Sequence, residues 1–350
     1  MTKLSTTPLR SSLLLPTWSR LSRPRAFHAT TTAIQGSHYP QVFDRQHKFL
    51  QRERAATDAA TSRQVDYLRD EVAHWLVDRL RDIKRRHGTI VELGAHSGHL
   101  AKHLDRELTD TVIQCDASPR MLYRDQHQEL RSRNGVVEGE EEIEGEGEPV
   151  NVEYRVMDEE KLDFKENSVE AIVSNLSLHW VNDLRGTLVQ IRRALVPDGM
   201  FLGAMLGGDT LFELRTSLQL AELEREGGIS PRVSPMANPR DMTDLLSQAG
   251  FTLTTVDVDE LVVNYPSPLH LMQDLRAMGE SNAVLQRRPY LPRDTLMAAS
   301  SIYNQLHGNE DGTVPATFQI IFLIGWKPHS SQPQPKPRGS ATTSLKDILS

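Results

Sequence analysis

Short apolar runs alternate with helix-like segments from residue 87 onward. Five of these runs are rich in β-branched and aliphatic residues, namely "TIVEL" (89–93), "TVIQC" (111–115), "VEYRVM" (152–157), "VEAIVSN" (169–175) and "MFLGAML" (200–206). Helical patterns surround Leu100, Met121, Leu188 and Leu211. Alternating strand and helix patterns predict an α/β fold, a mostly parallel sheet with helices on both faces.

Further patterns lie on either side of these runs. Within 41–86, apolar residues recur at three- and four-residue spacing, which predicts a long amphipathic helical segment. Two later strand patterns, "FTLTTVDVDELVVNYP" and "ATFQIIFLIGWKP", bring the expected sheet to seven strands, with helices near Met272 and over 294–306. Pro, Ser and Gln dominate the end of the chain and predict a flexible tail. We therefore expect a helical segment (41–86), a domain (87–328) and a tail (329–350).

The first 43 residues differ in composition from the rest. They hold five basic residues, many Ser and Thr, and no acidic residue. This composition is typical of a mitochondrial transit peptide. Arg25-Ala26-Phe27 followed by Thr30 is similar to the processing sites of matrix proteins, so we expect cleavage between Phe27 and Gln35 and assign 1–35 to the transit peptide. A disordered basic tail is the alternative.

The charge balance limits the classes of function. Loss of the five N-terminal basic residues would change the formal net charge from -7 to -12. Seven acids lie in "VVEGEEEIEGEGEP", which predicts a solvated insertion at 136–150. An acidic surface argues against a nucleic-acid partner, which requires a basic face. The single cysteine, Cys115, excludes an internal disulfide and predicts a buried apolar filler.

Acidic and small residues follow the ends of the first four expected strands. They are Glu92 at the end of the first strand with Gly94, Ala95 and Gly98 after it, Asp116 after the second, Asp158 and Glu159 after the third, and Asn175 at the end of the fourth. The carboxyl ends of parallel strands form the ligand-binding edge of an open sheet. Glycine lets the backbone approach a ligand, and a carboxylate can accept hydrogen bonds from ribose or adenine.

This order and spacing resembles the class I S-adenosylmethionine-dependent methyltransferases, whose first motif has an acidic residue followed by three glycines at alternate positions. The resemblance implies a Rossmann-like fold and S-adenosylmethionine held by the eight residues just named. His96 replaces the middle glycine. A β-carbon at positive φ costs on the order of 1 kcal/mol, and an inward imidazole would crowd the methionine group. An outward imidazole would leave the site intact.

Longer segments resemble a narrower family. They are "SNLSLHWVNDL", "GAMLGGDTLFELRTSLQLAELEREGG", "MGESNAV", "EDGTVPATFQIIFLIGWKPH" and "RGSATTSL". Together they are similar to mitochondrial arginine hydroxylases that act as complex I assembly factors, from about Phe43 to the C-terminus. The resemblance implies a matrix protein, peripheral at the inner membrane, that hydroxylates an arginine of the quinone-proximal iron–sulfur subunit.

Four residues are candidates for the chemistry. His179 can relay a proton and Trp180 can wall the pocket, or the two can cap and pack a helix start. Glu280 and Asp209 are candidate partners for a substrate guanidinium, which prefers a bidentate carboxylate. Asp209 can instead cap the helix that carries Glu213 and Arg215, and Glu280 can be a solvated helix-end charge.

Non-haem iron oxygenases bind their iron through two histidines and one carboxylate, so a metal site of this kind would require such a set in the sequence. The only close pair, His103 and Asp105, falls on a predicted helix, where residues two apart point to different faces. We therefore predict no metal site.

Two other functions stay open. "SNLSLHWVNDL" also resembles the malonyl-carrier-protein methyltransferases, which lack the segments "GGDTLFELR" and "GWKPH", so methyl transfer to a carrier protein or another protein is one alternative. The other is a non-catalytic chaperone that escorts a subunit, with cofactor binding abolished by His96. Fold alone does not separate these functions.

Overall fold

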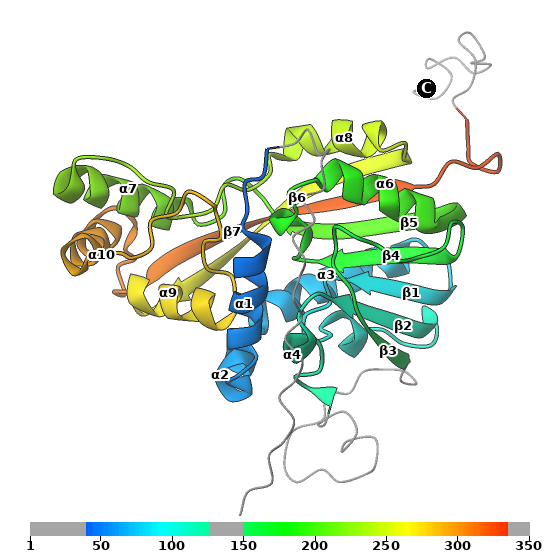
Figure 1. Cartoon of the computed structure of the whole chain (residues 1–350), viewed down its shortest axis with the longest axis horizontal. Coiled ribbons are helices and arrows are strands. Elements are labelled where there is room, and N and C mark those ends of the chain that lie inside the picture. Colours follow the sequence, from blue (N-terminus) through cyan, green and yellow to red (C-terminus); the bar gives the residue numbers. More distant parts are fainter. Residues whose placement is uncertain (1–39, 127–149, 335–350) are drawn as a thin grey trace, which may run out of the picture. The chain divides into compact units, whose positions relative to one another are not determined.

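The computed structural model describes residues 40–126 and 150–334 (Figure 1). The expected transit peptide (1–35), nearly all of the acidic insertion (136–150) and the segment "RGSATTSL" lie outside the described residues. Among the residues described, no helix is both long enough and apolar enough to cross a membrane.

Seven strands form one sheet in the order β3-β2-β1-β4-β5-β7-β6. Their bounds are β1 His87–Leu93, β2 Thr109–Asp116, β3 Asn151–Val156, β4 Val169–Asn175, β5 Leu195–Leu206, β6 Thr252–Tyr265 and β7 Val314–Trp326. Strands β1 to β5 pair in parallel, and β7 runs antiparallel between β5 and β6. This confirms the predicted α/β fold with a mostly parallel sheet of the Rossmann-like, methyltransferase type.

The helices differ from the sequence prediction in several places. They are α1 Arg45–Ala55, α2 Ala59–Gln64, α3 Tyr67–Asp82, the 3-10 turns η1 Leu100–Lys102 and η2 Leu178–Trp180, α4 Pro119–Leu122, α6 Leu184–Ala194, α7 Phe212–Glu226, α8 Pro239–Gln248, α9 Pro268–Ala277 and α10 Arg293–His307. The helical segment predicted for 41–86 consists of three helices, of which α3 carries the amphipathic pattern. The first helix ends at Ala55, and a new helix begins after Asp58, because Asp58 caps α2 by accepting from the Thr61 amide at 3.2 Å.

The helix expected around Leu100 is wrong. Only one 3-10 turn, η1, follows the glycine turn after β1. Asp105 lies beyond this turn, where its carboxylate accepts from the amides of Glu107 and Leu108 and forms a local turn of its own. Helix α8, which begins at Pro239 after an Asn238 cap, was not predicted.

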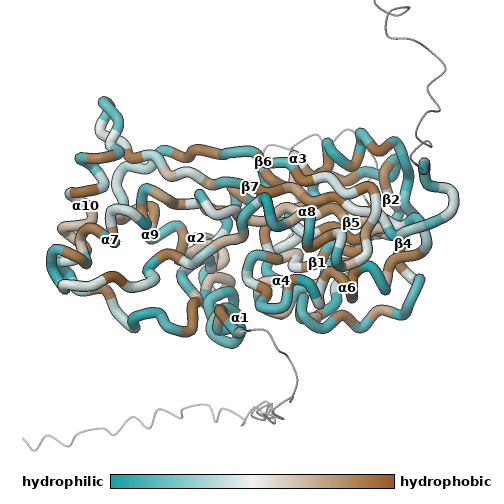
Figure 2. Tube along the Cα trace, turned by 90° about the horizontal axis from the view of Figure 1, so that it is seen from above, coloured by the Kyte–Doolittle hydropathy of each residue, from teal (hydrophilic) through white to brown (hydrophobic). Residues whose placement is uncertain are grey.

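Two apolar clusters cover the two faces of the sheet. Helix α3 packs on one face together with residues of α7, α9 and α10, whereas α6 and α8 pack on the other. Strands β6 and β7 project beyond the other strands, and α7, α9 and α10 pack around the projecting ends (Figure 1). Hydrophobic residues run along the middle strands of the sheet (Figure 2).

Helix α1 is anchored differently. Its buried residues are Lys48, Gln51, Arg52 and Ala55, and none of them belongs to either large apolar cluster. The helix therefore packs on the domain mainly through polar and charged side chains.

Candidate active site

The carboxyl ends of β2 and β4, together with Glu159 just beyond β3, meet the buried face of α1. The Arg52 guanidinium lies between the carboxylates of Asp116 and Glu159, with Nη1 2.8 Å from Glu159 Oε1 and 3.3 Å from Asp116 Oδ2. Its Nη2 donates to Ser177 Oγ at 3.0 Å. All four side chains are buried. Arg52 thus binds the carboxylates that the resemblance assigned to ribose and adenine.

Asp116 is held from the protein side as well. The Ser118 amide donates to Oδ1 at 2.8 Å, and the His96 amide donates to Oδ2 at 3.1 Å. Ser177 Oγ in turn donates to Glu159 Oε1 at 2.6 Å. Two carboxylates, one hydroxyl and one guanidinium therefore form a closed network with no contact to bulk water.

The ionisation states follow from burial and from the charges nearby. Burial would raise the pKa of Glu159, but Arg52 and Arg45 outweigh burial and lower it below its usual range. Burial and the neighbouring charge of Glu159 raise the pKa of Asp116 despite Arg52. Burial would lower the pKa of Arg52, but Asp116 and Glu159 raise it overall, so Arg52 is a cation.

Arg45 continues the ionic face of α1 toward the surface. Its Nη2 lies 2.8 Å from Asp158 Oδ1 and 2.5 Å from Glu159 Oε2. The Asp158 side chain is 41% exposed, whereas that of Glu159 is buried. A hollow of about 400 Å³ opens beside this pair, and its lining includes Phe49, Arg52, Ala117 and Met157.

Glu280 forms a second buried centre at the loop after α9. Oε1 pairs with Arg69, and Oε2 accepts from Trp180 Nε1 at 2.5 Å. Lys48 Nζ and His179 Nε2 approach Oε2 to 3.7 and 3.6 Å. With its side chain only 7% exposed, Glu280 is not the solvated helix-end charge that was the alternative. Burial would raise its pKa, but Lys48 and other neighbours hold it well below its usual range.

Trp180 and Lys48 stack against each other next to Glu280. Lys48 Nζ lies 3.4 Å from the centroid of the Trp180 ring and donates to the Gly279 carbonyl at 2.9 Å. Burial lowers the pKa of Lys48 to about 7. His179 lies within η2, which has no side-chain cap, so His179 does not cap this turn. Burial lowers its pKa as well, so the imidazole is neutral; its Nδ1 accepts from the Leu206 amide at 3.5 Å, which leaves the ring proton on Nε2.

His96 connects the two centres. Its φ is +52°, which confirms that the position requires the left-handed region. The ring is buried, with Nδ1 3.2 Å from the Gly94 carbonyl oxygen and Nε2 3.8 Å from Glu280 Oε1. The outward orientation considered from the sequence is therefore wrong.

The two motif glycines face the protein's own side chains. A β-carbon at Gly94, where φ is +71°, would lie 2.1 Å from Ser177 Oγ. One at Gly98 would lie 2.4 Å from Gln114 Nε2. In this conformation S-adenosylmethionine does not fit: Ser177 fills the space at the glycine turn, and Arg52 binds both carboxylates. We derive no step through this cofactor.

The remaining residues of the first-strand motif and of β4 are structural here. Ala95 is buried, and Asn175 Nδ2 donates to the Arg69 carbonyl at 3.0 Å. Glu92 is fully buried, and burial raises its pKa to about 8. Glu92 is therefore mostly protonated at neutral pH.

Asp209 lies apart from the other candidates. It does not cap α7, because the N-cap position is Leu211 at φ +55° and no side-chain cap is formed. Its Oδ2 accepts from Gln319 Nε2 at 3.0 Å, and it does not line the large cavity described next. Glu213 bonds to Thr317 at 2.5 Å, and Arg215 to the Gly208 carbonyl at 2.9 Å, so both brace the start of α7.

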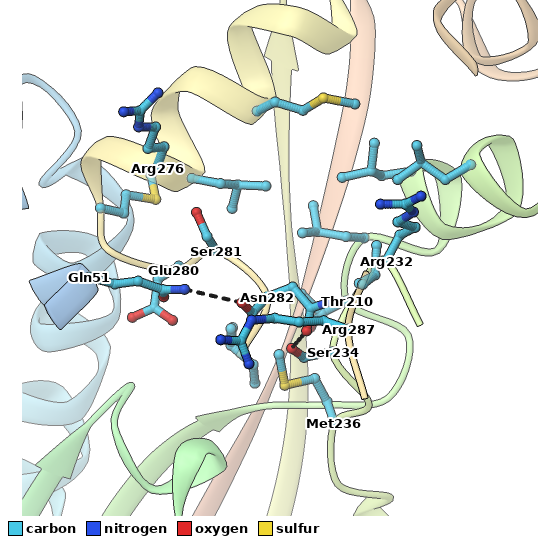
Figure 3. Close-up of a pocket in the computed structure, with 18 of the residues that line it drawn as sticks. Gln51, Thr210, Arg232, Ser234, Met236, Arg276, Glu280, Ser281, Asn282 and Arg287 are labelled. Carbon is cyan, nitrogen blue, oxygen red and sulfur yellow. Dashed lines mark hydrogen bonds between the residues drawn. The ribbon is translucent and has the colours of Figure 1, made fainter. Parts of the chain in front are cut away.

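A cavity of about 710 Å³ lies between α7, α9 and the sheet (Figure 3). Ten of its 26 lining residues are leucine or methionine and four are arginine, and Trp180 and Glu280 line it on the side of the ionic centres. Gln51 of α1 reaches it and donates to the Asn282 carbonyl at 3.1 Å, and Ser234 Oγ donates to Asn282 Oδ1 at 2.8 Å (Figure 3). Trp180 and Glu280 are thus two predicted residues that face a space able to hold a substrate segment.

Sequence reasoning missed the contribution of α1. Arg45, Lys48 and Arg52 are spaced three and four residues apart, which places three cations on one helix face. That pattern was visible in the sequence, but a cationic helix face usually lies in solvent. Across 40–126 and 150–334, no three His, Cys, Asp or Glu side chains form a group that could hold a metal ion.

Comparison with known proteins adds the following. The family model described as a methyltransferase domain matches residues 64–256. The mitochondrial arginine-hydroxylase NDUFAF5 of Danio rerio is 46% identical over 307 residues, covering 88% of this chain and 89% of the relative. The protein of the same name from Homo sapiens is 45% identical and covers 88% and 83%. A malonyl-[acyl-carrier protein] O-methyltransferase of Halorhodospira halophila is 29% identical over 279 residues, covering 78% and 86%.

Proposed function

Since this chain belongs to the family of the mitochondrial arginine hydroxylases NDUFAF5, with a methyltransferase domain as its scaffold, we propose that it hydroxylates an arginine side chain of a protein. The protein substrate is the quinone-proximal iron–sulfur subunit of complex I, acted on during assembly. The observation that carries this proposal is the identity of 45 to 46% over 88% of the chain, which spans the fold and the site together.

The chemistry of the site supports an arginine substrate. Its carboxylates already bind guanidinium groups of the chain itself, Arg52 at Glu159 and Arg69 at Glu280. A planar, weakly hydrated guanidinium is the cation best suited to such buried carboxylates. The cavity beside Trp180 and Glu280 gives the apolar neighbours of the substrate arginine a place to bind.

We assign binding and proton roles to the chain's residues. Trp180 walls the reacting end of the cavity, and Glu280 fixes the Trp180 indole by accepting its N–H at 2.5 Å. Neutral His179, whose Nδ1 accepts from the Leu206 amide and whose Nε2 lies 3.6 Å from Glu280, is placed to relay a proton through Nε2. For Asp209, which bonds to Gln319, we propose only a bracing role near the cavity.

The cellular site of this reaction is part of the proposal. We place the protein in the mitochondrial matrix, peripheral at the inner membrane. The basic, acid-free composition of residues 1–43 and the mitochondrial names of the relatives support this placement.

Peptide mass spectrometry of the iron–sulfur subunit tests the function. Cells that lack this protein are complemented with the wild type, with Glu280→Gln, or with Glu166→Gln, a surface carboxylate that serves as the matched control. We expect one arginine of the subunit to carry one extra oxygen with the wild type and the control, and to lack it in the deletion and with Glu280→Gln. The same arginine unmodified in wild-type cells would reject the function.

Methyl transfer is the second candidate, favoured by the methyltransferase-domain match and by the carrier-protein methyltransferase that covers 78% of the chain. It requires Arg52 to leave the cleft. Transfer of labelled methyl from S-adenosylmethionine to a carrier protein would favour it. Absence of label, together with the extra oxygen, would favour hydroxylation.

A further inference from the structure

We infer that the buried site formed by Asp116, Glu159 and Ser177 is the binding site for the guanidinium of the substrate arginine, and that Arg52 of α1 occupies it until the substrate displaces it. The inference rests on the proposed function for the nature of the substrate. The methyltransferase resemblance assigns the carboxylates of Asp116 and Glu159 to an adenosyl group, whereas this inference assigns them to recognition of a guanidinium.

The charges around the site allow one guanidinium to replace another but do not allow a further cation to be added. In the cluster that the described residues form, the carboxylates of Asp116, Glu159 and Glu280 face the buried side chains of Lys48, Arg52 and Arg69 and the partly buried Arg45. Each buried charge has a partner. A further arginine, or the sulfonium cofactor with its net positive charge, would add an unpaired buried charge, which is costly. Replacement of the Arg52 guanidinium by that of another arginine leaves this balance unchanged, provided that Arg45 and Lys48 of the same helix keep their carboxylate partners.

The fit of Arg52 is incomplete. Nη1 and Nη2 make all of its hydrogen bonds, and its buried Nε–H has no partner. The cradle itself is complete, because Asp116 is fixed by two backbone amides and Glu159 by Ser177. Groups other than Arg52 therefore also hold both carboxylates in place, which favours binding of a guanidinium there.

The helix that carries Arg52 is held on the domain mainly by polar contacts, which a polar substrate can exchange. Its buried residues are Lys48, Gln51, Arg52 and Ala55, and it adds nothing to the two large apolar clusters. A buried ion pair contributes little net stability, since desolvation offsets most of the attraction. A substrate that supplies an equivalent ion pair therefore offsets most of what is lost when Arg52 leaves. The 400 Å³ hollow is lined by Arg52 itself together with Arg45 and Asp158, so a substrate can reach the Arg52 side chain from there.

The test compares Arg52→Ala with Arg54→Ala, the same substitution at an exposed position of the same helix. The probes are N-acetyl-arginine amide, N-acetyl-lysine amide and S-adenosylmethionine, measured by calorimetry on the full-length protein. Because Arg52 competes for the site in the wild type, Arg52→Ala should bind the arginine amide about ten-fold or more tightly than the wild type and Arg54→Ala. The lysine amide should bind more weakly, since it lacks the planar donor fork.

Two results would overturn the inference. One is an Arg52→Ala protein that binds the arginine amide no better than the wild type does. The other is one that binds S-adenosylmethionine in preference to it, which would make the cleft a covered cofactor site.

If Arg52→Ala does not fold, hydrogen exchange on the wild-type protein provides a second test of the inference. Saturating arginine amide should speed the exchange of the amides of residues 45–55, and unchanged or slower exchange would contradict displacement. These measurements record binding only. They can fail while the subunit is still hydroxylated, or succeed while it is not, so the failure of this inference and that of the proposed function are distinguishable.

Discussion

Glu280→Gln tests whether the second ionic centre holds the domain together. The substitution keeps the shape of the side chain but removes the negative charge that Arg69 and Lys48 share. Loss of one partner from a buried ion pair costs about 3 to 5 kcal/mol, because the remaining charge stays buried without compensation. This is a large part of the roughly 5 to 15 kcal/mol that stabilises a typical domain. We expect the urea midpoint to fall accordingly, with an unchanged slope.

A matched substitution separates charge burial from a general effect of Glu→Gln. The Glu166 and Arg193 side chains are 57% and 69% exposed, so Glu166→Gln should change the unfolding free energy by less than about 1 kcal/mol. The double variant Arg69→Met with Glu280→Gln should recover part of the loss, because it removes the cation left unpaired, whereas Lys48, with a pKa of about 7 beside Glu280, becomes neutral without it. If Glu280→Gln costs no more than the Glu166 control, the reasoning about buried charge is refuted.

Three further predictions concern single side chains. Burial raises the pKa of Glu92 to about 8, so the stabilising contribution of this protonated side chain is present below pH 4.5 and is lost as the pH rises through 8. The unfolding free energy of Glu92→Gln, relative to that of the wild type, should therefore increase by up to about 1.4 kcal/mol per pH unit between pH 5 and 8. A difference that does not change with pH would contradict this. His96→Gly alone should give no calorimetric signal with S-adenosylmethionine, because Arg52 still binds the carboxylates; tight binding would show that the imidazole is the obstacle. Trp180→Phe loses the hydrogen bond to Glu280, so we expect a cost of about 1 to 3 kcal/mol in unfolding and a loss of subunit hydroxylation by mass spectrometry, whereas full activity would argue against its role.

Local patterns predicted the sheet well. All seven strands lie where apolar, β-branched runs occur. In the central strands β1, β4 and β5, burial on both faces leaves few positions for polar residues, whereas the edge strand β6 alternates half-buried and exposed residues. The helix boundaries were less predictable. Asp58 and Asp105 end or redirect the chain through side-chain hydrogen bonds to nearby amides, and these local bonds compete with the apolar periodicity that had indicated continuous helix.

The candidate site was predicted in part. Asp116, Glu159 and Gly94 do converge at one edge of the sheet, as their positions after consecutive strands required. Their partner was not predictable in the same way. Whether the cationic face of Arg45, Lys48 and Arg52 lies in solvent or against buried carboxylates depends on where α1 packs, and no residue spacing encodes that choice.

The sequence by itself determined the family, the order of strands and helices, and which carboxylates stand at the ends of strands, because each depends on motifs or on neighbours close along the chain. Only the tertiary structure decided what these carboxylates bind. Arg52 and Glu159 are 107 positions apart, and their pairing arises from the packing of an N-terminal helix over the sheet edge. A charge becomes a ligand, a counterion or a surface group according to its surroundings, and those surroundings exist only in the folded chain.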